Sequence, residues 1–545
     1  MTSWTLRSRE PEIDDRLSSG ANRPVEVLRD PDVLAGFAED AAHFPGGHAA
    51  GVAIPDTEAA VSQLLKGSSA SVLAVGAQSS LTGGATPRGD IVLSTRKLTR
   101  IDVVSSDRVR VQAGVSLAVL EEQLRRSGRS YPPVPTFTGA FAGGVVATNA
   151  AGAATFKHGT TRDWVEALTV VLADGDVLDV ERGRTQAHPD GYFELDLSRG
   201  RVRVPVPSYR RPTLAKLSAG YFAAPGMDLI DLFIGAEGTL GVVTSATFRV
   251  LTRRPAQCLA LVACSDATAA LGFVADLRRL ARETWTSKDP AGVDVSAIEH
   301  MDARSLQIVG EDRLPGIQLP PTFERAALAL LITLDLPGEV SAAQAFDELG
   351  RALDSDAPDT PLVRFCRCLA ATDGVDLASV QMAAPGDESR AAQLLAIREA
   401  VPAAVNQRVA RARQQDPRIE KVAGDLIVPF ERFEALVSRC HDEADRRGLD
   451  LAIWGHVSDG NIHPNIVPRS FADVEAGKDA ILAMGRAAIE LGGAPLAEHG
   501  VGRNPIKQEF LRLLYGDDGL EQMRAIKRAL DPGWKLAPGV LFPPG

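Results

Sequence analysis

The stretch "PTFTGAFAGGVVATNAAG", residues 135–152, is built almost entirely of small residues. Such a segment cannot form a large hydrophobic core by itself, because it has few bulky side chains to bury. Gly143, Gly144, Ala147 and Ala151 leave the backbone bare, which allows a planar group to approach it closely. Tight helix packing through small residues is the alternative. The sequence therefore predicts that something else fills the space beside this segment.

Two further segments also combine extended apolar residues with a loop of small residues: "VGAQSSLTGGATP", residues 75–87, and "LFIGAEGTLGVVT", residues 232–244. Backbone N–H groups in such a loop can cradle an anion. The first loop is not a nucleotide-hydrolase phosphate loop, because no lysine follows its second glycine, and it lacks the G-x-G-x-x-G of a Rossmann turn. ATP and NAD are therefore disfavoured as ligands. An ordinary glycine-rich turn is the alternative.

The composition is that of an ordinary folded protein, with 45% hydrophobic and 24% charged residues. A chain of 545 residues is expected to form several domains, at roughly 100 to 200 residues each. The formal charge of −11 argues against a general nucleic-acid-binding protein, which needs surplus Lys and Arg. We expect a cytoplasmic protein without a transmembrane segment, because no long apolar run and no signal-peptide core are present. Five scattered cysteines favour reduced thiols over disulfides.

Local patterns predict alternating helices and strands. We expect a helix over residues 57–67 and a buried strand over residues 71–77. An Asp-Gly pair between β-rich runs predicts a hairpin in "EALTVVLADGDVLDV", residues 166–180. Residues 181–212, rich in proline and arginine, are expected to form a surface excursion. After an Arg-Arg-Pro boundary near residue 255, strands alternate with helices, which predicts a sheet covered by helices.

The stretch "IWGHVSDGNIHPNI", residues 453–466, holds two of the nine histidines of the chain. If Asp459 and Gly460 are the central residues of a two-residue hairpin turn, His456 and His463 lie directly opposite each other. Directly opposed residues have Cβ atoms about 4.5 to 5.5 Å apart, which is close enough for two imidazoles to share a metal ion. Two surface histidines that flank a turn are the alternative.

A third metal ligand is available in "APLAEHGVGRNP", residues 494–505, which contains Glu498 next to His499. A set of two histidines and one glutamate leaves coordination positions open for water or substrate, as catalytic metals require. The sequence therefore predicts a catalytic metal site rather than a closed structural one.

In their order, the three small-residue segments resemble the FAD domain of the vanillyl-alcohol-oxidase superfamily. The pattern "GHVSDGNIHPN" followed by "EHGVG" resembles the C-terminal signature of the FAD-dependent D-2-hydroxyacid dehydrogenases, which include glycolate oxidase large subunits, D-lactate dehydrogenases and D-2-hydroxyglutarate dehydrogenases. The resemblance implies an α+β fold. It places an FAD-binding domain of the vanillyl-alcohol-oxidase type at residues 1–255, an antiparallel-sheet substrate (cap) domain covered by helices at 256–495, and a C-terminal segment returning to the FAD site at 496–545.

The resemblance also implies which residues contact FAD. Around the pyrophosphate these are Gly76, Ala77, Gln78, Ser79, Ser80, Gly83 and Gly84. Beside the isoalloxazine and ribityl groups they are Thr138, Gly139, Gly143, Gly144, Ala147, Asn149 and Thr161, with Asn465 near the flavin. Near the adenosine they are Glu237, Gly238 and Val242. Noncovalent FAD is expected, because the first loop contains no His or Cys, although His158 lies further along the chain.

The implied activity is oxidation of a D-2-hydroxy acid to the 2-oxo acid, with hydride transfer to FAD. By the resemblance, His456, His463 and Glu498 bind a divalent metal (Zn, Mn or Fe) that assists deprotonation of the hydroxyl, and His499 is the general base. Arg398 pairs with the substrate carboxylate. Many relatives have glycine at the position of Ser458, a change that is expected to preserve the hairpin.

The resemblance also implies the partners. These are a small 2-hydroxy acid and an electron acceptor that is a quinone, a cytochrome or an electron-transfer flavoprotein. A homodimer and peripheral association with a membrane are compatible with the sequence. Two alternatives remain: a flavin-containing transferase of the alkylglycerone phosphate synthase type, disfavoured because no run of adjacent histidines is present, and a noncatalytic FAD-binding subunit.

Overall fold

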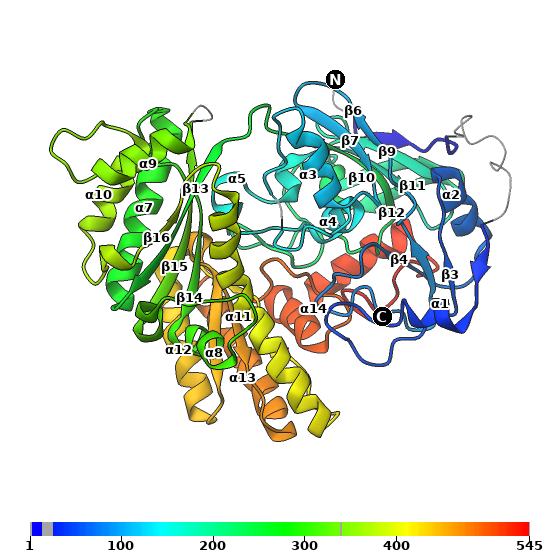
Figure 1. Cartoon of the computed structure of the whole chain (residues 1–545). Helices are drawn as coiled ribbons and strands as arrows, with labels where there is room; N and C mark the ends of the chain where they lie inside the picture. Colours follow the sequence, from blue (N-terminus) through cyan, green and yellow to red (C-terminus); the bar gives the residue numbers. More distant parts are fainter. Residues whose placement is uncertain (1–2, 13–24, 134, 338–339, 544–545) are drawn as a thin grey trace. The chain divides into compact units, whose positions relative to one another are not determined.

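The structure is a computed structural model that describes residues 3–12, 25–133, 135–337 and 340–543 (Figure 1). The chain divides into two compact units. The first unit comprises Met1–Gly152, Gly159–Thr252 and Leu496–Gly545, and the second comprises Ala153–His158 and Arg253–Pro495.

The short piece Ala153–His158 differs from the expected division, because it lies within the expected range 1–255 but belongs to the second unit. Lys157 explains this assignment. Its ammonium donates to the carboxylates of Asp294 and Asp335, both at 2.7 Å. Two charge-assisted hydrogen bonds fix the piece to the sheet of the second unit.

The first unit contains three sheets. A four-stranded sheet, parallel except for its edge strand β2, has the order β2 (Val27–Leu28), β3 (Gly51–Ala53), β5 (Ile91–Ser94), β4 (Val72–Val75). A five-stranded antiparallel sheet has the order β6 (Ile101–Val103), β7 (Arg108–Gln112), β12 (Val242–Arg249), β8 (Val165–Val171), β9 (Val177–Glu181). A small sheet contains β1 (Thr5–Arg7), β10 (Tyr192–Leu197) and β11 (Gly200–Pro205).

The helices of the first unit are α1 (Pro31–Ala35), α2 (Glu58–Gly67), α3 (Leu117–Arg125), α4 (Ala142–Thr148), η2 (Thr161–Trp164), α6 (Ile230–Phe233) and α14 (Pro505–Leu530). Helix α2 begins where the Thr57 side chain accepts the Ala60 amide. Its buried residues Val61 and Leu65 join a core with Leu93 of the parallel sheet and Val171 of the antiparallel sheet. Burial of each such side chain contributes about 1.5 to 3 kcal/mol.

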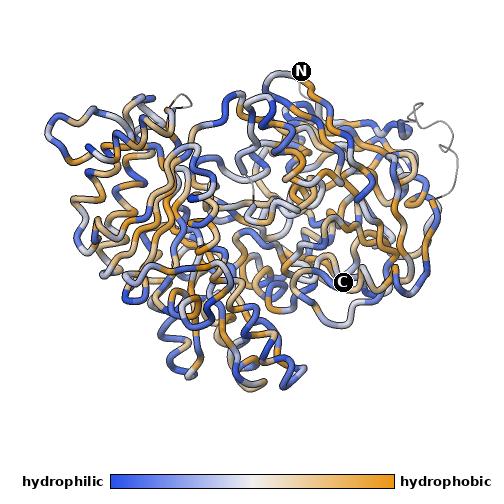
Figure 2. The backbone as a smooth tube through the Cα atoms, viewed as in Figure 1, coloured by the Kyte–Doolittle hydropathy of each residue, from blue (hydrophilic) through white to orange (hydrophobic). Residues whose placement is uncertain are grey.

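The second unit is built on one antiparallel sheet. Its strand order is β16 (Gln381–Ala383), β13 (Ala256–Cys264), β15 (Leu328–Leu336), β14 (Val295–Asp302), β19 (Leu451–His456), β20 (Asn461–Ile466), β17 (Val422–Ala423), with β18 (Leu426–Ile427) also paired to β20. Figure 2 shows apolar residues concentrated along the strands of this sheet. Such continuous hydrophobicity is typical of a sheet that is covered on both faces.

The helices of the second unit are α5 (Thr155–His158), α7 (Ala267–Ser287), α8 (Ala303–Asp312), η3 (Pro321–Arg325), α9 (Ala342–Arg351), α10 (Pro361–Ala370), η4 (Leu377–Ser379), α11 (Glu388–Gln415), η5 (Phe430–Arg432), α12 (Phe433–Arg446), η6 (Val457–Asp459) and α13 (Phe471–Glu490). Leu306 of α8 and Ile397 of α11 pack on sheet residues Leu261, Leu331 and Trp454. Helix α7 contacts β13 and β14 (Figure 1). The predicted α+β class and the antiparallel sheet covered by helices are confirmed.

Two predictions of local secondary structure can be compared with the observed elements. The Asp174-Gly175 hairpin is confirmed, with Val171 paired to Val177 and Gly175 at φ 89°. The strand expected at the start of residues 232–244 is wrong. Residues Ile230–Phe233 form helix α6 instead, and the Asp228 carboxylate accepts the Ile230 amide at its start.

Residues 181–212 form more than a surface excursion. Strands β10 and β11 pair as a hairpin, and β10 also pairs in parallel with β1 near the start of the chain. In the described part of the chain, no helix combines the length and the hydropathy needed to cross a bilayer.

Candidate active site

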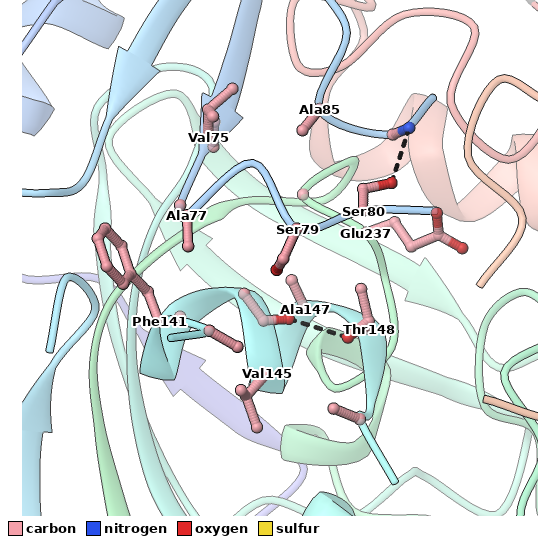
Figure 3. A pocket seen from close by; sticks show the side chains of 18 of the residues that line it. Val75, Ala77, Ser79, Ser80, Ala85, Phe141, Val145, Ala147, Thr148 and Glu237 are labelled. Atoms are coloured by element: carbon pink, nitrogen blue, oxygen red, sulfur yellow. Dashed lines mark hydrogen bonds between the residues drawn. The ribbon is translucent and has the colours of Figure 1, made fainter. Parts of the chain in front are cut away.

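A cavity in the first unit is walled by the three segments of small residues (Figure 3). It contacts the loop after β4, helix α4 and the residues before it, and the loop before β12. Figure 3 shows Ala77 and Ser79 of the first loop facing helix α4, which carries Val145, Ala147 and Thr148. The space predicted beside residues 135–152 is therefore a real cavity.

The loop after β4 is held open by its own side chains. Ser80 Oγ accepts the amides of Thr82 and Gly84, at 3.2 and 3.1 Å. Gln78 has a left-handed backbone, φ 56°, and its side-chain amide donates to the carbonyls of Gly36 and Glu39. The side-chain amide of Gln78 therefore fixes the loop to the preceding segment.

The two glycines of helix α4 have different roles. A Cβ on Gly143 would lie 2.7 Å from the Cβ of Ala113, so this glycine permits close packing of the helix on the end of β7. A Cβ on Gly144 would meet nothing within 4 Å, and Gly144 lines the cavity. The packing alternative is thus correct for Gly143, and Gly144 supplies the bare backbone.

The segment from Glu498 to Arg503 is tied to the cavity wall at two points. The Glu237 carboxylate accepts the amides of Val501 and Gly502, both at 2.8 Å. Burial raises the pKa of Glu237 to about 7, against these two hydrogen bonds, which favour the ionised form. Arg503 donates to the Thr86 carbonyl and, at 2.9 Å, to Asp90. These contacts hold Glu498 and His499 in the cavity lining.

Most of the residues predicted to contact FAD line this cavity: Gly76, Ala77, Gln78, Ser79, Ser80, Gly84, Gly143, Gly144, Ala147, Glu237, Gly238 and Val242. Six do not: Gly83, Thr138, Gly139, Asn149, Thr161 and Asn465. Among these, Asn149 ends helix α4 in a left-handed conformation and accepts the Arg162 amide. Thr161 is buried and donates to the Ala150 carbonyl. Both side chains are hydrogen-bonded within the protein and lie outside the cavity lining.

His456 and His463 belong to the second unit, and their predicted register is wrong. His463 pairs with Trp454, and His456 pairs with Glu299 of β14. The connection is longer than two residues, because η6 precedes Gly460, which has φ 84°. The two rings are diagonal neighbours rather than directly opposed. They still approach each other, with centroids 5.5 Å apart and planes at 90°.

Two family models match the chain. Residues 49–181 match a family described as FAD binding domain. Residues 264–541 match the family described as FAD linked oxidases, C-terminal domain. The chain belongs to the FAD-linked oxidases.

Three relatives of this FAD-linked oxidase align over most of its length. A glycolate oxidase subunit of Bacillus subtilis is 28% identical over 86% of this chain and 83% of its own. A D-lactate dehydrogenase of Archaeoglobus fulgidus is 28% identical over 89% of both chains. A D-2-hydroxyglutarate dehydrogenase of Xanthomonas citri is 27% identical over 90% of this chain and 89% of its own.

A solved structure of an alkyldihydroxyacetonephosphate synthase shares the fold of this FAD-linked oxidase. Its TM-score is 0.57 at 13% sequence identity, over 98% of this chain and 86% of that one. At this identity the likeness concerns the fold alone. The predicted resemblance to the FAD-dependent hydroxyacid dehydrogenases and their superfamily fold is confirmed by these matches.

The residues of this FAD-linked oxidase fit an FAD molecule. The cavity combines backbone N–H groups in a loop of small residues with the bare backbone of Gly144, which suits a pyrophosphate and a planar ring. Among the described lining residues there is no cysteine, and the one histidine is His499. His158, the histidine considered for covalent attachment, belongs to the second unit.

Two buried carboxylates next to His456 and His463 were not predicted from the sequence. Glu299 Oε1 lies 3.1 Å from His456 Nδ1, and its Oε2 accepts Arg398 Nε at 2.8 Å. Burial favours the protonated acid, yet Arg398 and His456 hold the pKa of Glu299 well below its usual value. Asp425, fully buried, has Oδ1 3.6 Å from His463 Nδ1. The Glu299 carboxylate at Nδ1 of His456 is placed to orient that ring so that its Nε2 can bind a metal, whereas Asp425 is beyond hydrogen-bond reach of His463 Nδ1.

Arg398 and Ser458 also have defined places. The side chain of Arg398 is buried against Glu299, and neither Nη has a hydrogen-bond partner in the described ranges. Ser458 Oγ accepts the amide of Ile298, at 3.2 Å. Ser458 therefore joins η6 to β14.

Proposed function

We propose that this FAD-linked oxidase oxidises a D-2-hydroxy acid to the 2-oxo acid. One observation carries the proposal: the ionisable side chains among the described lining residues of the cavity are Glu237, Glu498 and His499. The carboxylate of Glu237 is engaged by two amides, so His499 is the group suited to accept a proton from a substrate hydroxyl. The names of the three relatives, all acting on 2-hydroxy acids, support the same chemistry.

The protein residues have separate tasks in this reaction. We propose that His456, His463 and Glu498 bind a divalent zinc, manganese or iron ion, because two imidazoles and a carboxylate suit these metals. His499 takes the hydroxyl proton of the substrate. When bound, the metal lowers the pKa of that hydroxyl and FAD accepts the α-hydrogen as hydride. The two Nη groups of Arg398 bind the substrate carboxylate.

The same reasoning extends to the cofactor and the acceptor. FAD is bound noncovalently, since the cavity lining offers no cysteine and its one histidine, among described residues, is assigned to proton transfer. A quinone, a cytochrome or an electron-transfer flavoprotein reoxidises the flavin.

Anaerobic reduction of the bound flavin tests the proposal. D-Lactate, glycolate and D-2-hydroxyglutarate are added separately to the FAD-loaded protein, and the flavin absorbance is followed. At least one of them is expected to bleach it, and the L-enantiomer of a chiral substrate is not. A protein that no 2-hydroxy acid reduces, but that exchanges groups on an alkylglycerone phosphate, would instead be a transferase.

The role of Glu299 can be tested through metal affinity. Glu299→Gln keeps the shape of the side chain but removes the charge that orients His456, so metal affinity is expected to fall about 10- to 100-fold. FAD content stays unchanged, because Glu299 lies in the other unit from the cavity. Equilibrium titration with Mn²⁺ measures the affinity.

A matched control is Glu311→Gln, which alters another arginine-paired glutamate of the same unit. The control is expected to bind the metal as the wild type does. Equal affinities in Glu299→Gln and Glu311→Gln would remove Glu299 from the metal site.

A further inference from the structure

Lys216 is a buried lysine that no part of the proposed reaction uses. It lies in the irregular segment between β11 and α6, where the chain turns inward and residues 216–221 are all buried. Its side chain has no exposed surface. An ammonium in such a place costs several kcal/mol unless it is paired with an opposite charge.

The carboxylate of Glu498 pairs with the ammonium of Lys216. Nζ of Lys216 lies 2.7 Å from Oε2 of Glu498, and the glutamate side chain is itself only 10% exposed. Oε1 of the same carboxylate is 3.6 Å from Nε2 of His499. The lysine therefore places a full positive charge on the glutamate that stands beside the proposed base.

The backbone next to Lys216 is fixed, so the ammonium cannot easily leave. The Ser218 amide donates to the Leu496 carbonyl at 3.1 Å, and Ser218 Oγ donates to the Thr148 carbonyl at 3.1 Å. Thr148 is the last residue of helix α4. The segment is thus joined both to the chain that carries Glu498 and to the helix that walls the cavity.

We propose that Lys216 sets the affinity of Glu498 for a divalent cation by competing for the same carboxylate. The inference rests on the proposed function, in which Glu498 is a metal ligand. Two cations on one carboxylate repel each other, and this repulsion is weakly screened where both are buried. Lys216 stabilises the Glu498 carboxylate when the metal is absent. When the metal is present, the charge of Lys216 lowers the affinity of Glu498 for it. The metal is therefore exchangeable rather than permanently held.

Replacing Lys216 by methionine tests this competition with the full-length, FAD-loaded protein. Lys216→Met keeps the length of the side chain and removes its charge, so the Kd for Mn²⁺ is expected to fall at least about tenfold. Thermal unfolding with a chelator is expected at a lower temperature than for the wild type, and added Mn²⁺ is expected to raise it by a larger amount. Lys216→Arg, which keeps the charge, is expected to bind Mn²⁺ nearly as the wild type does.

Lys507→Met is the matched control, because Lys507 is a buried lysine of the same unit that lies near Glu237 instead. It is expected to leave the Mn²⁺ affinity unchanged. If Lys216→Met does not fold, Lys216→Gln and Lys216→Arg are compared in the same titration. A Kd in the uncharged variant that equals or exceeds that of the wild type overturns the competition.

The two proposals fail in different ways. If the wild type needs Mn²⁺ for flavin reduction and the uncharged variant binds it no more tightly, only the role of Lys216 is wrong. If the wild type reduces its flavin with substrate but takes up no divalent metal, the metal role of Glu498 is wrong and the competition with it.

Discussion

Replacing His456 or Glu498 with alanine is expected to abolish metal binding and to slow flavin reduction by at least about a thousandfold, or about 4 kcal/mol of activation barrier. Each variant removes one of three ligands and so disables the group that polarises the substrate hydroxyl. FAD is expected to stay bound, because the small-residue loops and helix α4 that wall the cavity are unchanged in both variants. Metal analysis and the flavin spectrum of the same purified sample measure the two properties.

His441→Ala is the matched control for His456→Ala, because His441 lies in helix α12 of the same unit. The control is expected to keep metal, FAD and turnover. Normal turnover in His456→Ala or Glu498→Ala preparations proven free of metal would contradict the assignment. Loss of FAD together with metal would instead indicate general misfolding of the variant.

Replacing His499 with asparagine is expected to lower the rate of flavin reduction about 10²- to 10⁴-fold, the usual contribution of a general base. Metal and FAD contents are expected to match the wild type, since His499 is not proposed to bind either. Because asparagine cannot accept a proton, the rise of rate with pH that reflects deprotonation of the base is expected to disappear. Stopped-flow reduction across a pH series measures both effects.

His43→Asn serves as the control for His499→Asn, because His43 is an exposed histidine of the same unit whose ring pairs with Glu39. Its pH profile is expected to be that of the wild type. An unchanged profile in His499→Asn would show that another group takes the hydroxyl proton.

Much of the FAD unit could be predicted from the sequence, because its signals are local. Small residues in 75–87 and 135–152 predict bare backbone wherever they fold, and the structure places them around one cavity. The hairpin at Asp174 and Gly175 was predictable for the same reason, since two adjacent residues determine its turn. The sheet of β1, β10 and β11 was not, because β1 and β10 are almost 190 residues apart in the chain.

The contacts of the candidate site could be predicted only where the residues are close in sequence. The spacing of His456 and His463 predicted that the rings meet, and they do, but not the register, because η6 lengthens the connection between β19 and β20. Glu299 and Asp425 lie far from their histidines in sequence, and Lys216 lies 282 residues from Glu498. No spacing rule links such residues. Only the folded chain brings each charge to its partner.

The most direct measurement compares anaerobic flavin reduction in one preparation before chelation, after chelation and after addition of Mn²⁺ or Zn²⁺, with the D-2-hydroxy acid that reduces it fastest. Rapid bleaching is expected before chelation, a loss of at least about a thousandfold in rate with FAD still bound after chelation, and recovery after the metal is added back. Equally rapid bleaching in the metal-free protein would contradict this expectation.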